Sequence, residues 1–310
     1  MSTVYFINGF LEAGKTSFIR DLLSKDYFQI DGRTLLLVCE EGDTEYDVEE
    51  LEAVKTDIEY ISDPEDFTEG HLTYIEKKYR PERIIVEFNG MWNRKNLEFP
   101  WYWGDFIEVA IFDALTFKLY SDNMRALLAE QVRNADIVVF NRCDSVRKDI
   151  GRYTRNIKAI NSKAAFIYLG KEGNITLDPD ETLPYDINED ELFLDDRGFA
   201  VFCMDSMERY GIYEGKVVHF SAMAYQMRNG QKFEFVAGRH IMTCCELDMS
   251  FVGIICSYIK SYKLENKSWV YVTAVVKISY DDDLKKYIPI CRVIDLSECE
   301  EPGNPIVSLI

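Results

Sequence analysis

Short apolar runs alternate with amphipathic stretches over the first 170 residues of the chain. Runs of this length, rich in β-branched and aromatic residues, predict buried strands, here over 4–7, 35–43, 57–62, 83–90, 108–114, 136–144 and 165–170. Between them, apolar residues at helical spacing predict helices, among them one starting at Pro64 and others over 122–133 and 145–160. Strands that alternate with helices predict a mainly parallel sheet covered on both faces, with the ligand site at the strands' carboxyl ends.

The pattern changes after residue 198, where short alternating runs are separated by turn residues. Six strand-like segments follow, namely FAVFCM, GKVVHFSAMAY, KFEFVAG, VGIICSYIK, SWVYVTAVVKISY and YIPICRVIDL. They predict a small, mainly-β, OB-like barrel over 198–310. Residues 171–197 contain ten acidic residues and two prolines, which favours a solvated linker, although the carboxylates could instead attract a cation or a basic partner. We therefore expect an α/β domain over 1–170, a linker and a barrel.

Composition excludes several classes of protein. The chain has 310 residues, 47% hydrophobic and 29% charged, as in a folded protein with two cores. Its formal charge of −19 argues against binding to nucleic acid or to an anionic membrane. No apolar run approaches the roughly 20 residues of a membrane span, the N-terminus is strand-like, and the eight cysteines are scattered except for one adjacent pair. These features predict a cytoplasmic protein with reduced thiols and leave its oligomeric state open.

The most informative motif lies directly after the first predicted strand. Gly9, Gly14, Lys15 and Thr16 fit the phosphate-loop pattern G-x-x-x-x-G-K-[ST]. Glycines let backbone N–H groups turn towards phosphate oxygens, the lysine reaches the β- and γ-phosphates, and the threonine hydroxyl binds Mg²⁺. The alternative, a glycine turn that only joins strand to helix, explains these flanks poorly. We expect a nucleoside phosphate to bind through Gly9, Glu12, Ala13, Gly14, Lys15, Thr16 and Ser17.

Polar residues follow the carboxyl ends of the other predicted strands. Glu87 is placed to hold Mg²⁺ opposite Thr16, unless it is simply an exposed carboxylate at a strand end. Asn141 and Asp144 have the spacing of the guanine-reading N-K-x-D motif, in which the aspartate accepts hydrogen bonds from N1 and N2 of guanine. Arg142 stands at the lysine position and can still lie over the base. Alone this spacing could be a turn, but downstream of a phosphate loop it favours guanine.

Several motifs occur together in one order. They are GFLEAGKTSFI, CEEGDTEYD (39–47), VEFNG (86–90), FDALTF (112–117) and EQVRNADIVVFNRCD (130–144). In this order they resemble the CobW-like GTPases, relatives of HypB and UreG. The resemblance implies binding of GTP and GDP, Mg²⁺-dependent hydrolysis that is slow without a partner, and a segment from Glu40 to Asp47 that responds to the γ-phosphate. It makes Lys15 and Glu40 candidate catalytic residues, the latter positioning Mg²⁺ or the attacking water.

The chain departs from that family in its metal-binding motif. Members usually carry C-x-C-C, whereas residues 59–70 here contain no cysteine, and three histidines cannot form a histidine-rich tract. Asn89 also replaces the usual Ser/Thr before Gly90. An inherited metal-transfer role is therefore not predicted from this region.

A second resemblance concerns residues 238–253 and 269–278. Arg239, Cys244, Cys245 and Asp248 match an R-x-x-x-x-CC-x-x-D signature. This is similar to the C-terminal domain of two-component permease-associated proteins (YcgR/YcgQ-type), which implies a membrane-permease or metal-handling protein as partner. Cys244, Cys245 and Asp248, with His240, could hold Zn²⁺ or another transition metal. Alternatively, one cysteine is buried and the other incidental, or the two thiols undergo redox chemistry.

Three functional hypotheses follow. The first is a Mg²⁺-dependent GTPase linked to metal homeostasis or a metal-transport partner. The second is a non-hydrolysing nucleotide-binding scaffold whose barrel is a protein-interaction module; single-turnover phosphate release separates these two. The third is an ATPase or small-molecule kinase of the phosphate-loop class, which competition between ATP and GTP would reveal.

Overall fold

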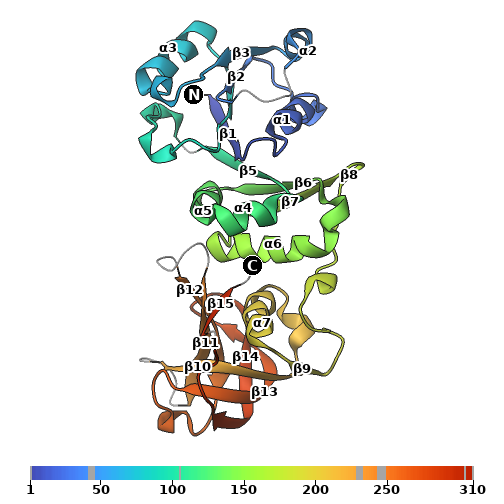
Figure 1. Ribbon diagram of the computed structural model, residues 1–310, viewed down its shortest axis with the longest axis vertical. Helices are drawn as coiled ribbons and strands as arrows, with labels where there is room; N and C mark the ends of the chain where they lie inside the picture. The colour runs from blue at the N-terminus through green and yellow to red at the C-terminus, as the bar shows by residue number, and fades with distance from the viewer. Residues whose placement is uncertain are drawn as a thin grey trace. The chain divides into compact units, whose positions relative to one another are not determined.

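A computed structural model describes residues 2–40, 46–104, 106–227, 233–242, 249–303 and 305–308 (Figure 1). The chain divides into two compact units. Unit 1 comprises Met1–Ile150 and Ile160–Thr176, and unit 2 comprises Gly151–Ala159 and Leu177–Ile310. Each unit has its own hydrophobic core, and each is described by itself below.

Unit 1 is built on an eight-stranded sheet in the order β3-β2-β4-β1-β5-β6-β7-β8. The first seven strands in this order are parallel, and β8 pairs antiparallel with β7. The central strands carry apolar side chains on both faces and are buried throughout, which explains why they appear in the sequence as continuous apolar runs. The strands are β1(Thr3–Gly9), β2(Thr34–Val38), β3(Thr56–Tyr60), β4(Arg83–Glu87), β5(Ile107–Asp113), β6(Ile137–Asn141), β7(Ala165–Gly170) and β8(Gly173–Asn174).

Two separate hydrophobic clusters show that both faces of this sheet are covered. The helices are α1(Lys15–Leu23), α2(Val48–Ala53), α3(Glu69–Tyr79), α4(Phe117–Asn123), α5(Arg125–Arg133) and α6(Arg147–Ile160), of which α6 has residues in both units. The helix that the sequence predicts to start at Pro64 starts later in the chain. Asp63 caps only a 3-10 turn (Pro64–Asp66), and α3 starts after Thr68, whose hydroxyl accepts a hydrogen bond from His71 N at 3.3 Å. The predicted α/β class with a mainly parallel sheet is confirmed.

Unit 2 is a five-stranded barrel with two short extra strands (Figure 1). Following the hydrogen-bonded neighbours gives the ring β10-β11-β12-β14-β13 and back to β10, in which only the β12–β14 pair is parallel. This ring order is that of an OB-type barrel, as the sequence predicts. The strands are β9(Glu191–Phe193), β10(Val217–Gln226), β11(Glu234–Met242), β12(Met249–Ser257), β13(Trp269–Asp281), β14(Lys286–Glu298) and β15(Ile306–Ser308).

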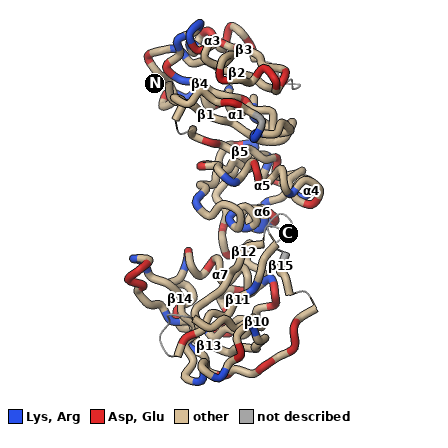
Figure 2. Tube along the Cα trace, turned by 90° about the vertical axis from the view of Figure 1, so that its left-hand side faces the viewer, with Lys and Arg blue, Asp and Glu red and all other residues tan. Residues whose placement is uncertain are grey.

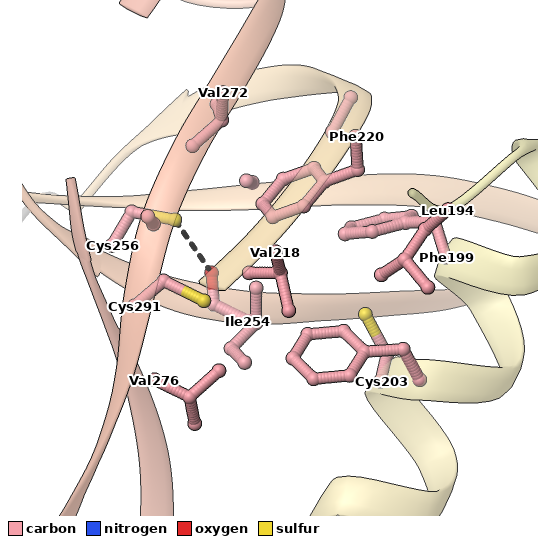
Figure 3. Packing of buried hydrophobic residues seen from close by; sticks show 14 of the residues in the cluster. Leu194, Phe199, Cys203, Val218, Phe220, Ile254, Cys256, Val272, Val276 and Cys291 are labelled. Carbon is pink, nitrogen blue, oxygen red and sulfur yellow. Dashed lines mark hydrogen bonds between the residues drawn. The ribbon is translucent and has the colours of Figure 1, made fainter. Parts of the chain in front are cut away.

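The segment FAVFCM is helical, so its assignment as a strand is wrong. It lies in α7(Asp196–Glu208), where the Asp195 side chain caps the helix by accepting a hydrogen bond from Gly198 N at 2.6 Å. A fully buried helix and a buried strand give the same short apolar run, so periodicity alone cannot separate them. Figure 3 shows Phe199 and Cys203 of this helix among the barrel residues Val218 and Phe220.

The acidic segment over 171–197 is structured in most of its length. It contains β8, a 3-10 turn (Asp180–Thr182) and β9, and β9 pairs parallel with β10 from Glu191 to Phe193. Residues from Leu177 onwards belong to unit 2. The acidic residues Glu189, Asp190 and Glu191 are exposed, whereas the apolar residues Leu192 and Leu194 that follow them enter the barrel core.

Charged residues occur along the elements of both units, with Asp and Glu interspersed among Lys and Arg (Figure 2). Within the described ranges, no helix is both long and apolar enough to cross a membrane.

A buried arginine fastens α7 to the barrel. Arg239 on β11 is almost fully buried, and its Nη1 donates to Asp196 Oδ1 at 2.8 Å and to the Ser221 carbonyl at 3.3 Å. Its guanidinium lies 4.7 Å from the centre of the Trp269 ring. A buried charge that loses its partner is costly, so we expect Asp196→Asn to lower the free energy of unfolding by about 1–2 kcal/mol in urea titrations. The control Asp190→Asn removes an exposed carboxylate, and equal stability of the two variants would contradict the prediction.

Candidate functional site

The phosphate loop joins β1 to α1, and its two glycines occupy positions that strongly favour glycine. Gly9 and Gly14 have φ of +148° and +95°. A Cβ on Gly9 would lie 2.2 Å from the Ile111 carbonyl oxygen, and one on Gly14 would lie 2.3 Å from Asn141 Nδ2. The loop is therefore packed against β5 and the end of β6, and at both glycines its backbone adopts a positive φ that residues with a side chain rarely adopt. This is a backbone cradle of the kind that binds phosphate.

Lys15 lies inside this loop. Its side chain is only 3% exposed, and Nζ donates to the carbonyls of Gly9 at 3.0 Å and Phe10 at 2.9 Å. The ammonium also forms an ion pair with Glu40, whose side chain is 7% exposed. The positive charge that would meet a phosphate is thus buried at the centre of the loop and is balanced by a carboxylate of the chain itself.

Thr16 and Glu87 are in direct contact, as expected of two residues placed to share a cation. Thr16 Oγ1 donates to Glu87 Oε1 at 2.6 Å, and the Tyr46 hydroxyl donates to Glu87 Oε2 at 2.6 Å. Glu87 is 3% exposed, so it is not a carboxylate simply exposed at a strand end, and burial raises its pKa despite the two hydrogen bonds. A hydroxyl and a carboxylate are hard oxygen ligands, so this pair fits Mg²⁺.

The guanine-type motif lies at the end of β6, against the phosphate loop. Asn141 Nδ2 donates to the Ala13 carbonyl at 3.3 Å, and Asn141 Oδ1 accepts from Arg142 N at 2.9 Å. The amide therefore ties the loop after β6 to the phosphate loop. Asp144 accepts a hydrogen bond from Lys171 N at 3.0 Å through Oδ2, which orients the carboxylate from the β7–β8 turn.

Arg142 makes a contact that the sequence does not reveal. Its guanidinium pairs with Asp113 at the end of β5 and donates to the Glu12 carbonyl at 3.1 Å. Both Arg142 and Glu12 have positive φ, 57° and 59°.

Between Arg142 and Asp144, Cys143 is buried, and burial raises the pKa of its thiol to about 12, which makes it unreactive at neutral pH.

Ser17 makes none of the contacts described above. Ser17 is exposed on α1, where it lines a cavity of about 520 Å³ between α1 and α2. Cys244, Cys245 and Asp248 lie outside the described residues. Among those that are described, no three His, Cys, Asp or Glu side chains are grouped so that they could hold a metal ion.

Two residues of the cluster were missed by sequence reasoning. Tyr46, which is buried and bonded to Glu87, lies in the CEEGDTEYD motif but has no chemical signature of its own. Gln131 on α5 is 3% exposed and donates to the Gly90 carbonyl at 3.0 Å, while Gly90 packs directly on the Gly9 carbonyl. The feature of the sequence that points to Gln131 is a glutamine within the otherwise apolar stripe of a helix.

Two family matches together cover most of the chain. Residues 172–308 match the DUF1980 C-terminal domain, whereas the resemblance to YcgR/YcgQ-type proteins stays a prediction. No curated protein matches the chain significantly.

Similar solved structures include HypB from Archaeoglobus fulgidus, 16% identical, covering 55% of this chain and 82% of that one with a TM-score of 0.41. HypB from Helicobacter pylori in complex with nickel is 13% identical, covering 58% and 82% at a TM-score of 0.38. The Zn(II)-bound YjiA GTPase from E. coli is 14% identical, covering 93% and 92% at 0.42.

The family assignment rests on the sequence match of unit 1. Residues 3–168 match the nucleotide-binding domain of CobW/HypB/UreG. This range is more than half of the chain and contains the phosphate loop, Glu87 and the motif around Asp144. The protein therefore belongs to the CobW/HypB/UreG family of nucleotide-binding proteins.

Proposed function

We propose that this protein is a Mg²⁺-dependent GTPase of the CobW class. The observation that supports it best is the hydrogen bond from Thr16 to the buried carboxylate of Glu87. Thr16 is the residue directly after Lys15 in the phosphate loop. Hydroxyl, carboxylate and ammonium then meet where a nucleoside triphosphate needs a cation and a positive charge. GTP binding followed by single-turnover phosphate release, each with and without Mg²⁺, tests the proposal.

In this proposal, different residues of the chain bind the phosphates, the base and the cation. The N–H groups of the loop and the Lys15 ammonium would bind the phosphates, and Asp144 would accept hydrogen bonds from the guanine ring. Thr16 and Glu87 would hold Mg²⁺, which supplies neutralisation of phosphate charge when bound. Because such catalysis depends on positioning and charge, hydrolysis is expected to be slow until a partner completes the site.

Glu87 is the residue that should make nucleotide binding sensitive to Mg²⁺. We expect Glu87→Gln to bind GTP normally in EDTA, but to lose about 10–100-fold in apparent Mg²⁺ affinity, because an amide is a weaker ligand than a carboxylate. Titration of Mg²⁺ into the protein with a fluorescent GTP analogue measures this. Glu98→Gln, an exposed glutamate outside the site, is the control, and unchanged Mg²⁺ dependence in Glu87→Gln would contradict the assignment.

A non-hydrolysing nucleotide scaffold is the second candidate. It is favoured by the position of Glu40, which is paired with Lys15 rather than exposed where it could orient a water molecule. If bound GTP stays intact over many hours in the presence of Mg²⁺, this candidate replaces the first.

A cytoplasmic location remains a separate proposal, and so does a link to metal homeostasis. The proposed metal link rests on Cys244, Cys245 and Asp248, which could hold Zn²⁺ or another transition metal. It also includes a metal-handling or permease protein as partner. Metal analysis of the protein with and without GTP, compared with the Cys244→Ser/Cys245→Ser variant, tests it. Metal content near zero in every sample would instead favour the barrel as a protein-interaction module.

A further inference from the structure

Two side chains of the protein are bonded to groups that a Mg²⁺-nucleotide complex would need, namely the Lys15 ammonium and the Glu87 carboxylate. Glu40, two residues beyond the carboxyl end of β2, is paired with Lys15. Tyr46, directly before the cap of α2, is hydrogen-bonded to Glu87. Neither contact is at the surface, because all four side chains are at least nine-tenths buried.

The contacts of Lys15 leave it no free donor. An ammonium group has three N–H donors, and here two carbonyls, those of Gly9 and Phe10, and the Glu40 carboxylate take them. A phosphate must therefore displace one of these acceptors. The two carbonyls belong to the loop that would hold the phosphate, whereas the Glu40 carboxylate carries the same sign of charge as the phosphate and is repelled by it.

The Glu87 carboxylate is also fully engaged. Its two oxygens accept hydrogen bonds from Thr16 and Tyr46, both at 2.6 Å. A cation that took Thr16 and Glu87 as ligands would compete with both hydroxyl protons. Tyr46 is the partner with no expected role in holding the cation, so its hydroxyl is the group to be displaced.

We propose that Glu40 and Tyr46 are internal ligands of the nucleotide site, Glu40 standing in for phosphate at Lys15 and Tyr46 for the cation at Glu87. The inference rests on the proposed GTP-binding function and adds to it that nucleotide affinity is held down by the protein itself. The apparent affinity of a site is its intrinsic affinity reduced to the fraction of molecules in which the site is free. Removing an internal ligand should therefore tighten binding.

The first arm of the test isolates Glu40. GDP affinity is measured in EDTA, where no cation contributes, for the wild type, Glu40→Gln and Asp21→Asn. We expect Glu40→Gln to bind GDP about tenfold more tightly or better, because Lys15 loses its competing carboxylate. Asp21→Asn removes a charge of the same sign from an exposed position on α1 that pairs with Lys25, and should leave the affinity unchanged.

The second arm isolates Tyr46. Tyr46→Phe removes only the hydroxyl that donates to Glu87. We expect its GDP affinity in EDTA to equal that of the wild type, while the Mg²⁺ concentration that gives half of the Mg²⁺-dependent tightening falls severalfold. A change in EDTA alone, or no change in either condition, would contradict the role of Tyr46.

The outcomes also separate this inference from the proposed function. A wild-type protein that binds neither GDP nor GTP in any condition refutes the function itself. A wild type that binds, with Glu40→Gln equal or weaker, overturns only the internal-ligand role of Glu40. If Glu40→Gln does not fold, Glu40→Asp serves instead: it keeps the charge but shortens its reach to Lys15, and should bind GDP more tightly than the wild type.

Discussion

Replacing Lys15 by alanine is expected to weaken GTP binding by at least about a hundredfold. The ammonium is the only positive charge buried in the phosphate loop among the described residues, and hydrogen bonds to charged groups contribute about 1.5–3 kcal/mol each. With about 1.4 kcal/mol per tenfold change in affinity, loss of contacts to two phosphate groups gives this magnitude. Fluorescence titration with a GTP analogue in the presence of Mg²⁺ measures the effect.

Two controls keep this result interpretable. Lys118→Ala removes an exposed lysine on α4 that pairs with Asp122 four residues on, and should bind GTP as the wild type does. Because Lys15→Ala would leave the Glu40 carboxylate buried without its ion-pair partner, the double variant Lys15→Ala/Glu40→Gln tests for a folding defect. Binding within a few-fold of wild type in both Lys15 variants would exclude the loop as the phosphate site.

Asp144→Asn should exchange the preferred base. The carboxylate would accept two hydrogen bonds from guanine, whereas an amide offers one acceptor and a donor, which suits the C2 carbonyl of xanthine. We expect GTP affinity to fall by about 10–100-fold and affinity for xanthosine triphosphate to rise above that of the wild type. Competition of GTP, XTP and ATP against a fluorescent analogue measures both changes.

The outcome also distinguishes base reading from a structural role. Asp144 accepts a hydrogen bond from Lys171 N at 3.0 Å, and a side-chain amide can accept the same bond through its oxygen. If Asp144→Asn lost GTP and XTP equally, the residue would act only by holding the β7–β8 turn. Asp122→Asn, an exposed change of the same kind on α4, should alter neither affinity.

Much of unit 1 can be predicted from sequence because its signals are local. Strands buried on both faces give unbroken apolar runs, as in β2 and β4, and the glycine-lysine spacing specifies a loop between β1 and α1. The helix α7 is mispredicted for the opposite reason: it is buried nearly all round, so its apolar residues show no helical period. Only the Asp195 cap marks it as a helix.

Some contacts of the candidate site can likewise be predicted from the sequence, and others cannot. The sequence predicts that Thr16 and Glu87 lie opposite one another, since the phosphate loop and Glu87 each stand at the carboxyl end of a predicted parallel strand. It does not predict that Glu40 pairs with Lys15 or that Tyr46 bonds to Glu87, because these contacts depend on the path of the chain after β2. The expectation for Cys244 and Cys245 stays a prediction, as they lie outside the described residues.

The ring of the barrel is closed over only a few residues between two of its strands. β12 and β14 pair only from Ile255 to Ser257 and from Ile290 to Arg292, whereas their other sides pair with β11 and β13 over most of their length. Among the described residues, 249–254 of β12 and 293–298 of β14 therefore have a strand partner on one side alone. Recognition by adding a strand needs a free edge of this kind, so a protein partner of the barrel could attach along this opening as well as through side chains on the outer surface.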